Sequence, residues 1–127
     1  MAETAAPLGF HHIRLELARE PGHPAGDPDT GYDIIAPLDA DRRLDAKLWR
    51  DVPDRCRVRR FSGAATLALG RLRHAAPDRW YLDFEPGEAD DVHGFRLADE
   101  RFETGEYVGL ATAEEAHTYV VVRVAPI

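Results

Sequence analysis

The sequence RCRVRRFSGAATLALGRLRHAAPDRWYLDFE, residues 55–85, alternates apolar and polar residues along most of its length. A period of two is typical of a β-strand that buries one face and exposes the other. Ser62-Gly63 and Ala76-Pro77-Asp78 supply turn residues that divide the stretch into three runs. We therefore predict three consecutive antiparallel strands. They cover residues 55–61, 65–73 and 79–85.

The faces of these strands depend on one assumption about their register. A two-residue turn at Ser62-Gly63 places Val58 opposite Leu67. Simple alternation then places Leu72 on the face opposite to Leu67 and Leu69. An extra residue near Gly70-Arg71 returns Leu72 to their face, because a β-bulge reverses the facing of the residues after it. With that bulge, one face is apolar and consists of Cys56, Val58, Leu67, Leu69, Leu72, Trp80, Leu82 and Phe84. The other face carries Arg55, Arg57, Arg59, Arg71, Arg73, Tyr81, Asp83 and Glu85.

Five further runs have strand character, and Glu20–Gly31, rich in proline and glycine, is predicted to be a loop. The predicted strands are residues 12–19, 32–38, 94–98, 106–111 and 117–124. Alternation along the first and the last two of these runs indicates which residues face the core. They are Ile13, Leu15, Leu17, Val108, Leu110, Val120, Val122 and Val124.

One α-helix is predicted near residues 41–51. Leu44, Leu48 and Val52 recur at the spacing of a buried helical face, and Asp39 or Asp41 can cap the first turn. Pro53 ends the helix.

About eight strands with one helix and short connections predict a mainly β protein. Parallel strands need long crossover connections, so the strands should be antiparallel. The fold class is a small antiparallel β-barrel or a strongly curved sheet. A length of 127 residues fits a single domain over residues 1–127, in which residues 1–9 are expected to be frayed.

Composition restricts the class of protein. A net charge of −7 argues against a dedicated nucleic-acid binder. The chain has no apolar run of the roughly 20 residues that cross a bilayer, and its N-terminus lacks the pattern of a secretory signal. The single cysteine, Cys56, excludes an intrachain disulfide. Fifteen arginines against one lysine are typical of a genome rich in G and C, so we expect a bacterial, cytoplasmic protein without membrane contact.

Charge is separated along the chain. Residues 55–79 carry seven arginines and one acid, whereas residues 80–106 carry nine acids and two arginines. Two explanations stay open. Either the arginines pair with Asp83, Glu85 and the acidic stretch Glu88–Asp91, or they bind an anion or an acidic peptide, whose carboxylates match guanidinium geometry.

The sequence therefore favours a non-catalytic binding or accessory protein that uses the arginine face and the acidic loop beside it. Its partner would be an acidic protein or a second copy of the chain, as a homodimer. The candidate anion- or partner-binding residues are Arg55, Arg57, Arg59, Arg71, Arg73 and Tyr81.

The alternative is an enzyme or small-ligand receptor with its pocket inside the barrel, where His12, His93 or Tyr107 would supply polar groups. No catalytic residue is assigned, and neither a cofactor nor a metal is predicted. Asp90, Asp91 and His93 are the nearest approach to a metal site, but they match no known ligand spacing. Cys56 is expected to be a buried, inert thiol.

Overall fold

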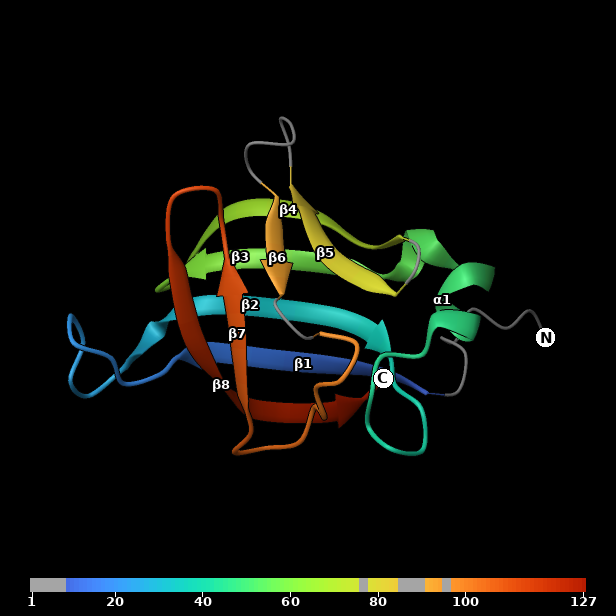
Figure 1. Ribbon diagram of the computed structural model, residues 1–127, viewed down its shortest axis with the longest axis horizontal. Coiled ribbons are helices and arrows are strands. Elements are labelled where there is room, and N and C mark those ends of the chain that lie inside the picture. Colours follow the sequence, from blue (N-terminus) through green and yellow to red (C-terminus); the bar gives the residue numbers. More distant parts are fainter. Residues whose placement is uncertain (1–8, 76–77, 85–90, 95–96) are drawn as a thin grey trace.

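The computed structural model is a closed barrel of eight antiparallel strands that follow one another in chain order (Figure 1). It describes residues 9–75, 78–84, 91–94 and 97–127. Each strand pairs with its neighbours in the sequence, and the last returns to the first and closes the barrel. The strands are β1 (Phe10–Leu17), β2 (Asp27–Pro37), β3 (Arg57–Ser62), β4 (Ala65–Ala75), β5 (Arg79–Phe84), β6 (Val92–Gly94), β7 (Tyr107–Ala111) and β8 (Ala116–Pro126). The predicted mainly β fold with eight strands is confirmed.

The described residues form one short α-helix, α1 (Ala46–Asp51), which follows β2, and a 3₁₀ turn at Pro53–Arg55 leads into β3. The predicted helix was too long at its start. Asp45 is the N-cap, and its carboxylate accepts the Leu48 N–H at 3.1 Å. The Asp39 carboxylate instead accepts hydrogen bonds from the N–H groups of Asp41 and Arg43 in the loop before the helix, which holds that segment in a turn. No helix in the described part of the chain has the length and apolarity needed to cross a bilayer.

The barrel has two different ends (Figure 1). At one end lies α1, where Trp49 donates its indole N–H to the Leu72 carbonyl at 2.8 Å and packs edge-on against Trp80. At the other, which we call the open end, lie the β1–β2 connection, the Gly63-Ala64 turn and the β7–β8 turn at residues 112–115.

A continuous cluster of buried apolar side chains, contributed by all eight strands, fills the barrel. Its largest fully buried members within the strands include Ile13, Leu15, Leu72, Trp80 and Leu82. Burial of this apolar area is the main source of stability, at roughly 25 cal/mol per Å². The described core of the barrel is therefore apolar.

The register between β3 and β4 differs from the prediction. Val58 lies opposite Gly70 rather than Leu67, and Leu67 is the extra residue between the pairs Arg60–Ala68 and Phe61–Thr66. The bulge is thus at Leu67 and not at Gly70-Arg71. A bulge at either position turns Leu72 toward the core, so alternation alone does not show which of the two positions carries the bulge.

The shifted bulge changes the facing of two residues. Leu67 is 57% exposed and Leu69 is 65% exposed, so the prediction that they face the core was wrong. The other six predicted apolar residues are buried, as expected. They are Cys56, Val58, Leu72, Trp80, Leu82 and Phe84.

A second bulge corrects the prediction for the last strand. Leu15 lies opposite Val121 whereas Arg14 lies opposite Arg123, so Val122 is an extra residue in β8. Tyr119 and Val121 face the core, and Val124 packs against it as predicted. Val120 and Val122 were wrongly predicted to be core residues. They are partly exposed and lie outside the buried cluster.

Candidate functional site

The predicted arginine face lies on the outer surface of β3, β4 and β5. Arg57 on β3 lies opposite Arg71 on β4, and Arg71 in turn lies opposite Asp83 on β5. A groove of about 360 Å³ runs across these strands. We call it the arginine groove. It is lined by Arg57, Val58, Leu69, Gly70, Arg71, Arg73 and Asp83.

Two arginines of the groove pair with aspartates. Arg71 contacts the Asp54 carboxylate at 2.9 Å, and Arg73 contacts the Asp83 carboxylate at 3.1 Å. The Asp54 side chain is 87% exposed, so water competes for its contact with Arg71. Exposed pairs of this kind contribute only about 0.2–1 kcal/mol each. Both arginines can therefore exchange their aspartate partner for a carboxylate of a bound molecule at a small cost in free energy.

Arg57 is held more loosely. Its Nε donates to the Asp54 main-chain carbonyl at 3.5 Å, which is the upper limit for a hydrogen bond. Within the described part of the chain, the ion pairs of this face engage Arg71 and Arg73 rather than Arg57. The Arg57 guanidinium thus keeps most of its donors for solvent or a ligand.

Arg59 belongs to a different cluster. It contacts Asp33 at 2.8 Å and donates to the Thr66 hydroxyl at 2.6 Å. His12 contacts the same carboxylate at 2.8 Å, and the Asp33 side chain is only 13% exposed. The guanidinium of Arg14 lies 4.0 Å above the centre of the buried Phe61 ring. These contacts hold the outer faces of β1, β2 and β3 together and leave Arg59 committed within the fold.

The last two predicted residues lie near the groove without lining it. Arg55 is exposed in the 3₁₀ turn before β3. Tyr81 stacks on His93 at 5.5 Å between ring centres, and Arg79 lies over its ring. The structure therefore brings three of the six predicted residues together in one groove.

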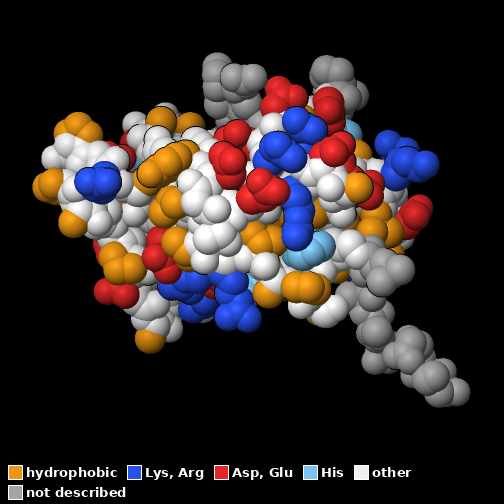
Figure 2. All heavy atoms as spheres, turned by 90° about the horizontal axis from the view of Figure 1, so that it is seen from below, with side chains coloured by type: hydrophobic (Ala, Val, Ile, Leu, Met, Phe, Trp, Pro, Cys, Tyr) orange, Lys and Arg blue, Asp and Glu red, His pale blue; other side chains and the backbone are white. Residues whose placement is uncertain are grey.

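The aspartates that pair with arginines of the predicted face come from different parts of the sequence. Asp83 does pair with an arginine, as one explanation expected, but Asp33 and Asp54 also pair with arginines of the predicted face. Glu85 and residues 88–90 lie outside the described residues. On the face seen in Figure 2, cationic and anionic side chains lie interspersed over the upper part, and a group of cationic side chains lies near the lower edge.

Leu69 lines the arginine groove, and Leu67 lies two residues before it on β4. Both are exposed although the remaining leucines within the described strands are buried. The sequence alternation concealed this feature, because two apolar residues in a strand are normally assigned to the core. The groove thus combines guanidinium groups with aliphatic surface.

The residues predicted for a pocket inside the barrel lie outside it. His12 contacts Asp33 on the outer face, His93 stacks on Tyr81, and Tyr107 is 61% exposed. Because each alternates with a buried neighbour, none of the three reaches the interior. Asp90, considered for a metal, lies outside the described residues, and in the rest of the described chain no group of three or more His, Cys, Asp or Glu could hold a metal ion.

Cys56 is fully buried, which confirms the prediction. Burial raises the pKa of its thiol to about 12. Because the thiolate is the reactive form, this cysteine is chemically inert in the folded protein.

Sequence reasoning missed a pocket at the open end whose lining includes Glu20 and His117. These residues are 97 positions apart, and no motif links them. Comparison with known proteins gives no further guide, since no family model, curated protein or solved structure matches the chain.

Proposed function

We propose that this is a non-catalytic binding or accessory protein of the bacterial cytosol, whose arginine groove docks an acidic segment of a partner protein. The observation that carries the proposal is the groove itself, in which Arg57, Arg71 and Arg73 lie beside the exposed Leu69. Guanidinium groups match the geometry of carboxylates and form paired hydrogen bonds with them.

The aliphatic part of the surface supports a protein partner over a free ion. Arginine is enriched in protein interfaces, and exposed leucines gain about 25 cal/mol per Å² when a partner covers them. A partner segment that alternates acidic and aliphatic residues would satisfy Arg57 and Arg71 while covering Leu67 and Leu69.

Binding suits this groove better than catalysis for a chemical reason. Guanidinium groups stay protonated at all physiological pH values, so they do not act as general acids or bases. Their role in the groove is to attract and orient negative charge.

The proposal is tested with a fluorescein-labelled peptide of alternating glutamate and leucine, followed by fluorescence anisotropy. We expect binding that weakens as salt rises, because exposed charge pairs are screened. The double substitution Arg57→Ala and Arg71→Ala should weaken binding about tenfold or more. Arg50→Ala, an exposed arginine on α1 outside the groove, is the matched control and should bind like the wild type.

Two results would contradict the proposal. One is equal binding by the double variant and the Arg50→Ala control. The other is equal binding of a lysine–leucine peptide, since that would show contact without charge recognition. Analytical ultracentrifugation measures the oligomeric state and so tests the alternative of a homodimer. If the wild type is a dimer and the Leu69→Ala variant is a monomer, this face binds a second copy of the chain instead.

A further inference from the structure

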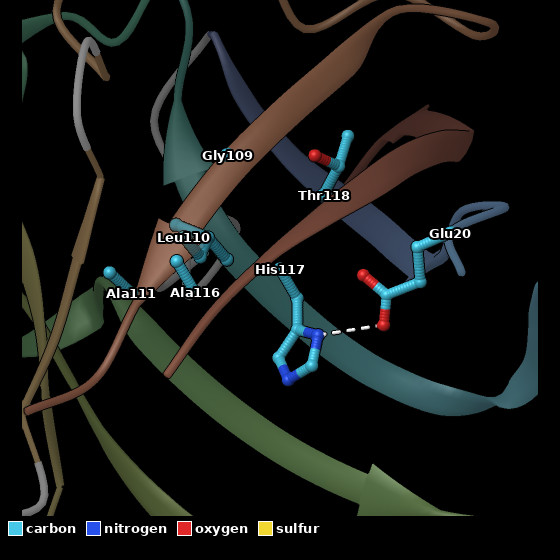
Figure 3. Close-up of a pocket in the computed structure, with 7 residues that line it drawn as sticks. All are labelled: Glu20, Gly109, Leu110, Ala111, Ala116, His117 and Thr118. Carbon is cyan, nitrogen blue, oxygen red and sulfur yellow. Dashed lines mark hydrogen bonds and ion pairs between the residues drawn. The ribbon is translucent and has the colours of Figure 1, made fainter. Parts of the chain in front are cut away.

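A second candidate site lies at the open end of the barrel. A pocket of about 330 Å³ lies between the β7–β8 hairpin and Glu20, which follows β1 (Figure 3). This volume falls at the lower end of the range for small-molecule sites. Leu110, Ala111 and Ala116 supply apolar surface, and Glu20 and His117 supply the polar side of the pocket.

The polar side is built around His117. Its Nδ1 lies 2.8 Å from a Glu20 carboxylate oxygen, as the dashed line in Figure 3 shows, and its Nε2 lies 3.0 Å from Glu115. Hydrogen bonds to Glu115 and Glu20 raise the pKa of His117 above its ordinary value. Even with this imidazole protonated, the two carboxylates leave the trio with a net negative charge.

Buried tyrosines separate this pocket from the barrel interior. Tyr119 lies near His117, with 6.5 Å between ring centres, and packs edge-on against Tyr32 at 5.2 Å. Burial raises the pKa of both tyrosine hydroxyls, so they remain neutral. A ligand would therefore bind at the rim of the barrel, against the hairpin, rather than deep among the strands.

We propose that this pocket binds a small amphiphilic amine. Its ammonium group would donate hydrogen bonds to Glu20, which lines the pocket, and to Glu115, which contacts the His117 ring without lining the pocket. Its apolar part would lie against Leu110, Ala111 and Ala116. An ammonium carries three donors and no acceptor, and each ionised carboxylate has acceptor sites beyond the one that His117 uses. An anionic ligand of the same shape would face both carboxylates and be repelled. Arg60, whose positive charge opposes the rise in the pKa of Tyr32 and Tyr119, is not among the residues that line the pocket.

The test uses three probes of matched shape: 2-phenylethylamine, 2-phenylethanol and phenylacetate. Isothermal titration calorimetry measures their affinities, and ¹H–¹⁵N spectra of the histidine side chains locate the binding. We expect the amine to bind about tenfold or more tightly than the alcohol, and phenylacetate to bind most weakly. Only the amine and the alcohol should shift the His117 ring nitrogens, with His74, which packs against Trp49 of α1 at the opposite end, unchanged.

Substitutions separate recognition from folding. Glu20→Gln and Glu115→Gln should each reduce the amine affinity about fivefold or more while leaving the alcohol affinity within about twofold. Glu114→Gln, in the same turn, is the matched control and should bind the amine like the wild type. Glu115 is exposed, so its variant keeps the test valid if Glu20→Gln fails to fold. Equal affinities for amine and alcohol, no binding at millimolar concentration, or an equal loss in Glu114→Gln would each overturn the proposal.

Discussion

Replacing Gly70 with alanine should lower the free energy of unfolding by roughly 1–2 kcal/mol. A Cβ atom at this position would lie 2.2 Å from the Asp83 carbonyl oxygen and 3.0 Å from the Phe84 ring. The oxygen belongs to the backbone of β5, so relief requires the two strands to shift apart. Overpacking of this kind costs about 1–3 kcal/mol, and the smaller freedom of alanine in the unfolded chain offsets about 0.4–1 kcal/mol of it.

Gly109 provides the matched control for this prediction. It also lies within a strand, but a Cβ atom there would meet nothing within 4 Å. Gly109→Ala should therefore leave stability unchanged or raise it by up to about 1 kcal/mol. Urea unfolding of the wild type and both variants, with equal m-values, measures the difference. A Gly70→Ala variant as stable as Gly109→Ala would refute the β4–β5 register on which the arginine groove depends.

Three further predictions concern burial and titration. Leu69→Ala should change stability by no more than about 0.5 kcal/mol, whereas Leu72→Ala should cost about 2–5 kcal/mol in the same urea assay; similar losses would place Leu69 in the core. Cys56 should react with a thiol reagent only as fast as the protein unfolds, because burial raises its pKa to about 12, and rapid labelling of the folded protein would contradict its burial. The pKa of His117 is raised above 6.5, so its stabilising contribution is complete below pH 6.5 and is lost as pH rises through the folded-state pKa; an NMR titration that gives a pKa at or below 6.5 would be inconsistent with its carboxylate contacts.

Alternation of residues was sufficient to predict most of the strands and most of their facing. The prediction was wrong for β6, which is Val92–Gly94 rather than residues 94–98, and for the start of β2, which begins at Asp27 inside the predicted loop. Alternation identified Trp80, Leu82 and Phe84 as core residues and placed Arg57 and Arg71 on the outside, because those side chains differ strongly in polarity. Such a pattern fixes a face wherever one side of a strand is buried.

Alternation failed where a bulge could sit at more than one place. Extra residues at Leu67 and Val122 reverse the facing of their neighbours, and apolar side chains on both faces leave no contrast that would locate the bulge. Hydrophobicity therefore favoured burying Leu67 and Leu69, and the exposed surface beside the arginines was visible only in three dimensions.

The pocket at the open end depends on closure of the barrel. Glu20 meets His117 because β1 pairs with β8, so that the segment after Leu17 lies beside the start of the last strand. A contact across 97 positions has no local signal in the sequence. The length of the helix was overestimated for a related reason. Leu44 was assigned to the apolar face of the helix, but it reaches the core from a loop in which it forms a β-bridge with Leu38.

The docking role of the arginine groove is tested most directly by amide chemical shifts of the labelled protein during titration with the glutamate–leucine peptide. We predict that the largest shifts fall on Arg57, Leu69 and Arg71, on the outer face of β3 and β4. Shifts confined to the open end of the barrel, or shifts spread evenly over the surface, would contradict the assignment of this groove as the partner-binding site.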